Sequence, residues 1–501
     1  MEVVGRRIAY VYGRALTVLA GVVAASGVVL FPCPAAPAVE PGYRRLVELE
    51  STRTFSAGLT AALASADARL AARAALALGR TEDARAAGPL ENATDAQDVS
   101  VRALAVYGYG LLAAQYPIQG EIIVRRLADR ASAVRAAAVD AAWRMKAAGR
   151  PGADATLAPL LAMLERDRDP LVRARAATAL SGWHDGPLGV TVARRVQHAL
   201  SREQNLTVRW HLAWTLRRAY PKRTAAYTIR AGLRGPDELV RIQFADLVGR
   251  RENRAGLALL RPLLADPSWR VREQALESIR VLRGLPRTEH LKAIPAGVVT
   301  PPPVPPSRAV ALAAPSGLGT PRRPTAADAR LDLPLRPVTA ALMDGPMPGP
   351  HPRVRIGTTE GPIVVRLYPE WAPLTVANFL GLVERRYYDG LRWFRIVPDF
   401  VVQTGDPTNT GDGDAGYTIP AEENPLEQTS GVISMGLNYT NGKKPAPIRD
   451  SAGTQFYITI SPQLHLDRDF TVFGRIESGF PVLGRLTERD RMTRVVRIAD
   501  D

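Results

Sequence analysis

The stretch Trp393–Asp406 reads WFRIVPDFVVQTGD and sets the expectation for the last third of the chain. Its apolar residues fall in two short runs, 392–396 and 400–404, which predict two β-strands. One longer apolar stretch, 372–384, predicts a helix. Similar short runs, bounded by Gly, Pro, Asp and Asn, predict five more strands, at 354–358, 361–367, 432–435, 455–460 and 471–476. So many strands with so little helix indicate a closed or sandwich-like β domain over residues 351–501.

Several segments of this part resemble the cyclophilin family. Segments similar to other blocks of the family stand in the family order, at 372–379 before the opening stretch and at 431–435, 454–458, 466–467 and 470–474 after it. Six residues of the stretch match the family signature F-H-R-x-I-P-x-F-x-x-Q-G-G-D in register: Arg395, Pro398, Phe400, Gln403, Gly405 and Asp406. The resemblance implies a closed, eight-stranded antiparallel β-barrel capped by two helices. It also implies peptidyl-prolyl cis-trans isomerase activity.

The resemblance further implies which residues form the site. An X-Pro bond rotates over a barrier of about 20 kcal/mol, and twisting it returns a lone pair to the prolyl nitrogen. A guanidinium held near that nitrogen stabilises the twisted amide, and Arg395 is the candidate. Gln403 and Phe400 share the catalytic assignment, since the glutamine orients Arg395 and the ring holds the proline. The substrate-binding assignment covers Val401, Gly436, Leu437, Gln455, Tyr457, His465, Leu466 and Phe470.

Among the candidate site residues, four positions besides His465 depart from the family pattern. Val401 replaces the usual Met, Tyr457 the usual Phe, and Phe470 the commoner His or Tyr. All three keep an apolar wall, so we expect turnover to survive. Leu437 stands where the family often has Asn, but that contact is made largely through the backbone.

The remaining features near the site indicate no metal chemistry. One Cys and six scattered His exclude a Cys-rich zinc or iron–sulfur site, and the isomerisation requires neither metal nor cofactor. His465 occupies the position of the Trp associated with tight cyclosporin binding, which implies weak inhibition. The chain between Met435 and Gln455 is longer than the family's short form, so residues 438–451 are expected to form an exposed loop beside the site.

Residues 41–292 contain a repeated unit, D-x-x-V-R, followed by a helix rich in Ala and Leu. Consecutive anchors of this unit lie 31 to 38 residues apart, which fits one helical hairpin per repeat. The array resembles HEAT repeats and predicts an α-solenoid whose concave surface docks protein partners. The seven anchors are Leu70, Val101, Val134, Val172, Val208, Val240 and Val271.

The Asp and Arg of each unit have two interpretations. The Asp caps the second helix while the Arg pairs with an acidic residue of the neighbouring unit, or the arginines line a groove that binds an anionic polymer. The first is favoured because repeat geometry demands the same residue at each step whatever the ligand. The net charge of +16 fits either, because residues 351–501 carry 17 basic and 19 acidic residues and the excess lies before them. The tryptophans of the array are expected in its core or its cap rather than in a binding stripe: Trp143, Trp183, Trp210, Trp214 and Trp269.

Residues 1–40 are typical of a signal peptide or membrane anchor. Three arginines precede the apolar run 15–31, and small residues follow it. The run is long for a signal peptide and short for a spanning helix, so cleavage and anchoring both remain open. Cys33 is a possible lipidation site. We therefore expect an exported protein of the bacterial periplasm or cell envelope.

A proline-rich linker is expected at residues 293–350, between the repeat array and the β domain. The stretch 295–352 holds 15 of the 41 prolines, a composition typical of a semi-rigid, polyproline-like tether.

The favoured hypothesis is an exported prolyl isomerase that assists the folding of proline-containing polypeptides, with its repeat array docking protein partners. The alternative is a non-catalytic scaffold that grips proline-containing segments. No nucleic-acid partner is expected, and a membrane is contacted only through the N-terminal segment.

Overall fold

The computed structural model describes residues 41–118, 120–285, 351–397, 399–414, 416–439 and 447–498. The predicted signal segment with Cys33, the predicted linker 293–350 and Pro398 of the signature lie outside these residues. Within them, no helix combines the length and the apolar character that crossing a membrane demands.

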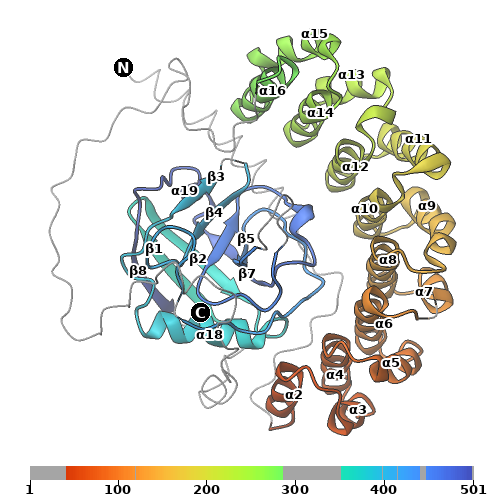
Figure 1. Ribbon diagram of the computed structural model, residues 1–501, viewed down its shortest axis with the longest axis vertical. Helices are drawn as coiled ribbons and strands as arrows, with labels where there is room; N and C mark the ends of the chain where they lie inside the picture. The colour runs from red at the N-terminus through yellow and green to blue at the C-terminus, as the bar shows by residue number, and fades with distance from the viewer. Residues whose placement is uncertain are drawn as a thin grey trace.

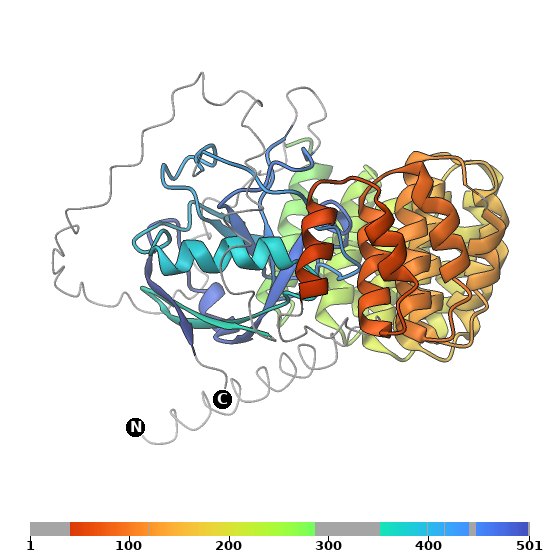
Figure 2. The ribbon, with the colours of Figure 1, turned by 90° about the horizontal axis from the view of Figure 1, so that it is seen from below.

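The first described part is a curved array of helical hairpins in two rows, and both views place it around one side of the β domain (Figures 1 and 2). After α2 (Pro41–Ser51), the inner row lines the concave side: α4 (Ala68–Arg80), α6 (Val99–Gln115), α8 (Ser132–Ala147), α10 (Pro170–Ala179), α12 (Leu206–Ala219), α14 (Glu238–Arg250) and α16 (Trp269–Leu282). The outer row comprises α3 (Ala57–Leu63), α5 (Ala87–Ala93), α7 (Gly120–Arg126), α9 (Leu157–Arg166), α11 (Gly186–Arg202), α13 (Ala226–Arg234) and α15 (Leu257–Leu260). Short 3-10 turns join them: η1 (Ala84–Ala86), η2 (Ala153–Thr156), η3 (Leu180–Trp183), η4 (Pro221–Arg223), η5 (Arg254–Gly256) and η6 (Arg261–Ala265). Each of the seven anchor residues lies in its own inner helix.

The repeated Asp and Arg act as the capping and pairing interpretation predicted. Asp98, Asp169 and Asp237 cap inner helices by accepting from backbone N–H groups of the first turn. Four of the repeat arginines reach an acidic residue of the next unit: Arg102 to Asp129 (3.0 Å), Arg135 to Asp167 (2.7 Å), Arg173 to Glu203 (2.8 Å) and Arg241 to Asp266 (2.8 Å). Arg209 and Arg272 donate to backbone carbonyls instead. The four ion-paired arginines therefore join neighbouring repeats.

Small residues set the spacing of the inner row. A Cβ atom on Gly79 of α4 would lie 2.3 Å from the Cα of Gly108 in α6, so neither helix could approach so closely with a larger residue. The alanines of α4, α6 and α8 are almost all fully buried. The resulting core is continuous along the whole array.

The second described part is an antiparallel sheet of eight strands in the order β3-β4-β6-β5-β7-β2-β1-β8. Helix α18 (Pro373–Glu384) covers the sheet and buries Phe379 against Phe456 and Phe473. The short helices are η7 (Leu464–Leu466) and α19 (Phe480–Leu483). The strands are β1 (Arg353–Thr358), β2 (Gly361–Leu367), β3 (Arg395–Val397), β4 (Val401–Thr404), β5 (Val432–Met435), β6 (Phe456–Thr459), β7 (Val472–Ser478) and β8 (Met492–Ile498).

Two expectations for this sheet need correction. The closed barrel is wrong, because β3 and β8 end the strand order and no ladder between them is seen in the described chain. Their flanks are joined by the isolated bridge between Arg392 and Arg491 and by a hydrogen bond from the Gly390 N–H to the Met492 carbonyl. The sheet is an open half-barrel. The sequence pattern also missed β8, in which polar residues at 493 and 494 interrupt the apolar alternation.

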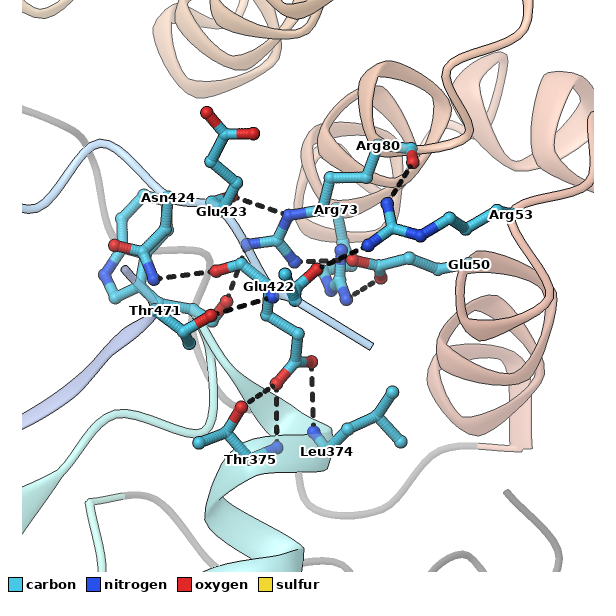
Figure 3. Close-up of polar contacts among 12 residues, drawn as sticks. Glu50, Arg53, Arg73, Arg80, Leu374, Thr375, Glu422, Glu423, Asn424 and Thr471 are labelled. Atoms are coloured by element: carbon cyan, nitrogen blue, oxygen red, sulfur yellow. Dashed lines mark hydrogen bonds and ion pairs between the residues drawn. The ribbon is translucent and has the colours of Figure 1, made fainter. Parts of the chain in front are cut away.

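The β domain occupies the concave side of the array, and a buried ionic network joins the two near α2 and α4 (Figure 3). Glu50 pairs with Arg73 and with Arg80 (2.5 Å), and all three are almost fully buried. The Arg80 guanidinium also contacts the β domain, where it donates to the carbonyls of Glu423 (2.7 Å) and Trp371 (2.9 Å). Arg80 thus links both parts of the chain through one guanidinium.

The same segment of the β domain also secures α18. The Glu422 carboxylate accepts from the backbone N–H groups of Leu374 (3.0 Å) and Thr375 (2.7 Å) in the first turn of that helix (Figure 3). Its neighbour Glu423 accepts from Arg144 of α8 (2.6 Å). Two adjacent glutamates therefore bind α18 of the β domain and α8 of the solenoid.

Candidate functional site

A chain of polar side chains positions the predicted catalytic arginine. Arg395 and Gln403 are paired across β3 and β4, and Arg395 Nη1 donates to Gln403 Oε1 at 3.1 Å. Gln403 Nε2 donates in turn to Gln455 Oε1 at 3.0 Å. Gln455 Nε2 donates to the carbonyls of Gly411 (2.8 Å) and Gly413 (3.0 Å). Both glutamines therefore have fixed amide orientations, and the acceptor oxygen of Gln403 faces Arg395.

The end of the signature builds the loop on which this chain rests. The buried Asp406 carboxylate accepts from the backbone N–H groups of Thr408 (2.6 Å), Thr410 (2.8 Å) and Gly411 (2.6 Å). Gly405 before it has φ +93°, and an added Cβ would lie 2.3 Å from the Thr454 carbonyl. Only glycine combines that backbone angle with that approach.

An apolar cup lies beside Arg395. Its walls are the buried side chains of Val401, Tyr457, Leu466 and Phe470, with Phe400 and Leu437 packed against them. The rings of Tyr457 and Phe470 meet edge to face at 5.6 Å. The structure thus brings together the predicted cup residues from β4, β6, η7 and the loops.

Phe400 connects the cup to the arginine and to the rim. The Arg395 guanidinium lies 5.4 Å from the centroid of the Phe400 ring, and the exposed His465 stacks on that ring at 5.6 Å with an interplanar angle of 17°. Gly436 lies against the glutamines, since an added Cβ would be 3.1 Å from Gln455 Cβ and 3.3 Å from Gln403 Nε2. All eleven predicted site residues therefore lie in the cup, in the polar chain or on their rim.

The electrostatics of Arg395 differ from those of an ion-paired arginine. Burial lowers the pKa of its guanidinium, against a smaller opposing influence of Tyr439 and Tyr457. Tyr439 is a neighbour that the sequence analysis did not name. It is half exposed, and its ring lies 6.4 Å from that of Phe470. The sequence feature that could have identified Tyr439 is its position in the predicted loop 438–451, which was expected beside the site.

The solenoid contacts the rim of this site directly. Arg270 of α16 pairs with Asp399, and Trp210 and Trp214 of α12 pack on Leu464. The expectation that the five array tryptophans lie in its core or its cap rather than on a contact surface is therefore wrong in part. Trp183 is buried in the array, whereas Trp269 is 53% exposed and Trp143 lies under Arg468 at 4.2 Å.

The loop expected at 438–451 also needs correction. Asn438 and Tyr439 are exposed, but the far end of the segment is held by the solenoid. Arg449 pairs with Glu82, and Asp450 accepts from Arg53 at 2.5 Å. In the described parts of the chain, no three His, Cys, Asp or Glu side chains are placed to hold a metal ion.

Two parts of this chain match known protein families, and the β domain is similar to known proteins. Residues 353–500 match the family described as cyclophilin type peptidyl-prolyl cis-trans isomerase/CLD, and residues 193–280 match HEAT repeats. Peptidyl-prolyl cis-trans isomerase B of Bacillus subtilis is 42% identical over 135 residues, which cover 26% of this chain and 88% of the relative. Peptidyl-prolyl cis-trans isomerase-like 1 of Aspergillus niger is 41% identical over 138 residues, 26% of this chain and 80% of the relative. A crystal structure of a Cryptosporidium parvum cyclophilin type isomerase matches 30% of this chain and 99% of its own, at 28% identity and a TM-score of 0.28.

Proposed function

Because this chain belongs to the cyclophilin-type peptidyl-prolyl cis-trans isomerases, we propose that Arg395 is its catalytic residue and that the cup of Val401, Tyr457, Leu466 and Phe470 holds the proline ring. The observation that carries this assignment is the 3.1 Å hydrogen bond from Arg395 to the neutral Gln403, beside that cup.

The proposed mechanism needs no bond making or breaking. Apolar walls fix the pyrrolidine ring while the preceding residue rotates, and rotation removes the amide resonance that makes up most of the barrier. The prolyl nitrogen then gains a lone pair, to which the Arg395 guanidinium donates. Gln403 and Gln455 hold that guanidinium before the substrate twists, so little reorganisation is needed in the transition state.

Exchange spectroscopy by NMR on an X-Pro peptide tests the assignment with the full chain. We expect Arg395→Ala to reduce the catalysed exchange rate roughly 10²- to 10³-fold, the usual loss for a preorganised donor. Arg392→Ala, an exposed arginine three residues earlier, is the matched control and should keep its rate. Ordinary turnover by Arg395→Ala would overturn the mechanism. Peptide binding by the unmodified chain without faster exchange would favour the non-catalytic scaffold.

We also propose that the clients are exported polypeptides and that protein partners dock on the solenoid. The apolar run 15–31 after three arginines supports export. The concave side already holds the β domain, so docking partners would use the outer row of helices or its edges. Fractionation of cells that produce the full chain tests export, and recovery in the cytosol alone would overturn it.

A further inference from the structure

Three arginines cluster at the C-terminal ends of two neighbouring helices of the inner row, beside the rim of the isomerase site. Arg217 and Arg218 lie in the last turn of α12, and Arg250 lies in the last turn of α14. Arg217 follows Trp214 by three residues and so shares the helix face that packs on Leu464 of the rim. The cluster therefore belongs to the solenoid surface that meets the β domain.

The charges of this cluster are not balanced. The Asp246 carboxylate accepts from Arg217 Nη1 at 2.7 Å and from Arg250 Nε at 2.8 Å, and both bonds use the same oxygen, Oδ2. Arg218 is exposed. In addition, Arg217 Nε is buried without a hydrogen-bond acceptor among the described residues. One carboxylate thus binds two guanidinium groups, Arg218 adds a third positive charge, and one buried donor of Arg217 has no acceptor among the described residues.

The charges of the cluster influence His465, which lies on the rim of the cup. The neighbouring protein removes water from around the imidazole, and this desolvation lowers the pKa of His465. The charges of Arg217, Arg218 and Arg250 lower the pKa further, to about 4. The imidazole is consequently neutral near pH 7 and adds no charge of its own. The ring of His465 stacks on Phe400, so the arginine charges that act on His465 lie near the edge of the proposed proline pocket.

We propose that this arginine cluster selects clients that carry Asp or Glu a few residues from the isomerised X-Pro bond. The inference rests on the proposed function, because a polypeptide leaving the cup past Phe400 and His465 passes the cluster. A client carboxylate there is attracted by the excess positive charge of the cluster. A client lysine at the same place is repelled.

The test compares peptides that share one X-Pro core and carry Glu, Gln or Lys at each of the four positions on either side. With the full chain, we expect kcat/KM for Glu to exceed that for Gln by about fivefold on one side of the proline, the upper range for a partly exposed ion pair. The preference should fade as salt screens it. Equal rates for Glu and Gln at every position would overturn the proposal.

A double variant, Arg218→Gln with Arg250→Gln, should lose the preference for Glu and keep the rate on the all-neutral peptide. The matched control, Arg194→Gln with Arg202→Gln, removes two exposed arginines from the outer helix α11 and should keep the preference. A preference that survives in the cluster variant would also overturn the proposal. The two proposals fail separately, because the neutral peptide and Arg395→Ala test the mechanism without reference to the cluster.

Discussion

The β domain meets guanidinium groups in two contrasting environments. At its contact with the solenoid, Arg73 and Arg80 both bind the buried Glu50. Burial alone would lower the pKa of Arg73, but Glu50 outweighs it and raises that pKa. In the isomerase site, Arg395 binds a neutral amide, and burial leaves its pKa lowered.

The difference separates structural from catalytic use of the same side chain. A guanidinium that already faces a carboxylate has its charge compensated, so an approaching peptide group gains little from it. A guanidinium held by an amide is fixed in place but keeps its charge for the twisted bond. The contrast predicts that interface arginines affect stability and that Arg395 affects rate.

The largest effect is expected for Arg80→Met. The variant leaves Glu50 buried with Arg73 as its remaining partner and removes the donor from the carbonyls of Glu423 and Trp371. Breaking a buried ion pair from one side costs about 3–5 kcal/mol. We expect a loss of that size in the free energy of unfolding, measured for the full chain by urea denaturation.

Arg85→Met provides the control, because the Arg85 side chain is 67% exposed and pairs with Asp83 in the same unit. Its cost should stay below about 1 kcal/mol. Equal, small losses for both variants would contradict the view that the buried network holds the two parts together. Isomerase activity of folded Arg80→Met near the unmodified rate would sharpen the contrast with Arg395.

The second prediction gives Arg395 a carboxylate partner, like the one that Arg73 and Arg80 have in Glu50. Gln403→Glu has almost the same shape, places a carboxylate beside Arg395 and loses the donor to Gln455. We expect kcat/KM for an X-Pro peptide to fall roughly 10- to 100-fold, the range set by hydrogen bonds to charged groups. The free energy of unfolding should change by less than about 1 kcal/mol.

Gln403→Ala separates charge compensation from the loss of positioning. It removes the support of Arg395 without adding a carboxylate, so its rate should lie between those of the unmodified chain and Gln403→Glu. A fully active Gln403→Glu would show that the neutrality of this partner is unimportant.

The two environments also differ in how far the sequence predicts them. The cup and Arg395 come from short motifs, and the pairs such as Arg102 with Asp129 repeat with the period of the array, so both leave a local signal. The link from Arg80 to Glu423 joins residues 343 positions apart and follows no period. The docking of the β domain against the concave side of the solenoid therefore could not be predicted from the sequence.

The errors within the β domain have a similar cause. Motif order implies the number of strands but does not show whether the two ends of the strand order pair. β3 contains three residues and pairs with β4, and the described strands show no ladder between β3 and β8. The closed barrel was inferred from the resemblance, whereas edge pairing depends on where each strand ends.

The smallest effect is expected near Asp399, which precedes Phe400 of the isomerase site and pairs with Arg270 of the solenoid. Glu273 of α16 lies near this carboxylate, and burial together with the charge of Asp399 raises the pKa of Glu273 to about 7. Its pKa in the unfolded chain is about 4.3. Because the folded value is the higher one, this group favours folding at low pH, and that contribution is lost as the pH rises from about 4 to about 7. Glu273→Gln should therefore match the unmodified chain at pH 4 and exceed its stability at pH 8 by less than about 1 kcal/mol, since Glu273 is partly exposed. Thermal unfolding at both pH values measures this, and Glu488→Gln, at an exposed glutamate of the β domain, controls for the loss of one negative charge. A gain of equal size at pH 4, or none at pH 8, would show that the charge of Glu273 does not weaken the contact between Arg270 of the solenoid and Asp399.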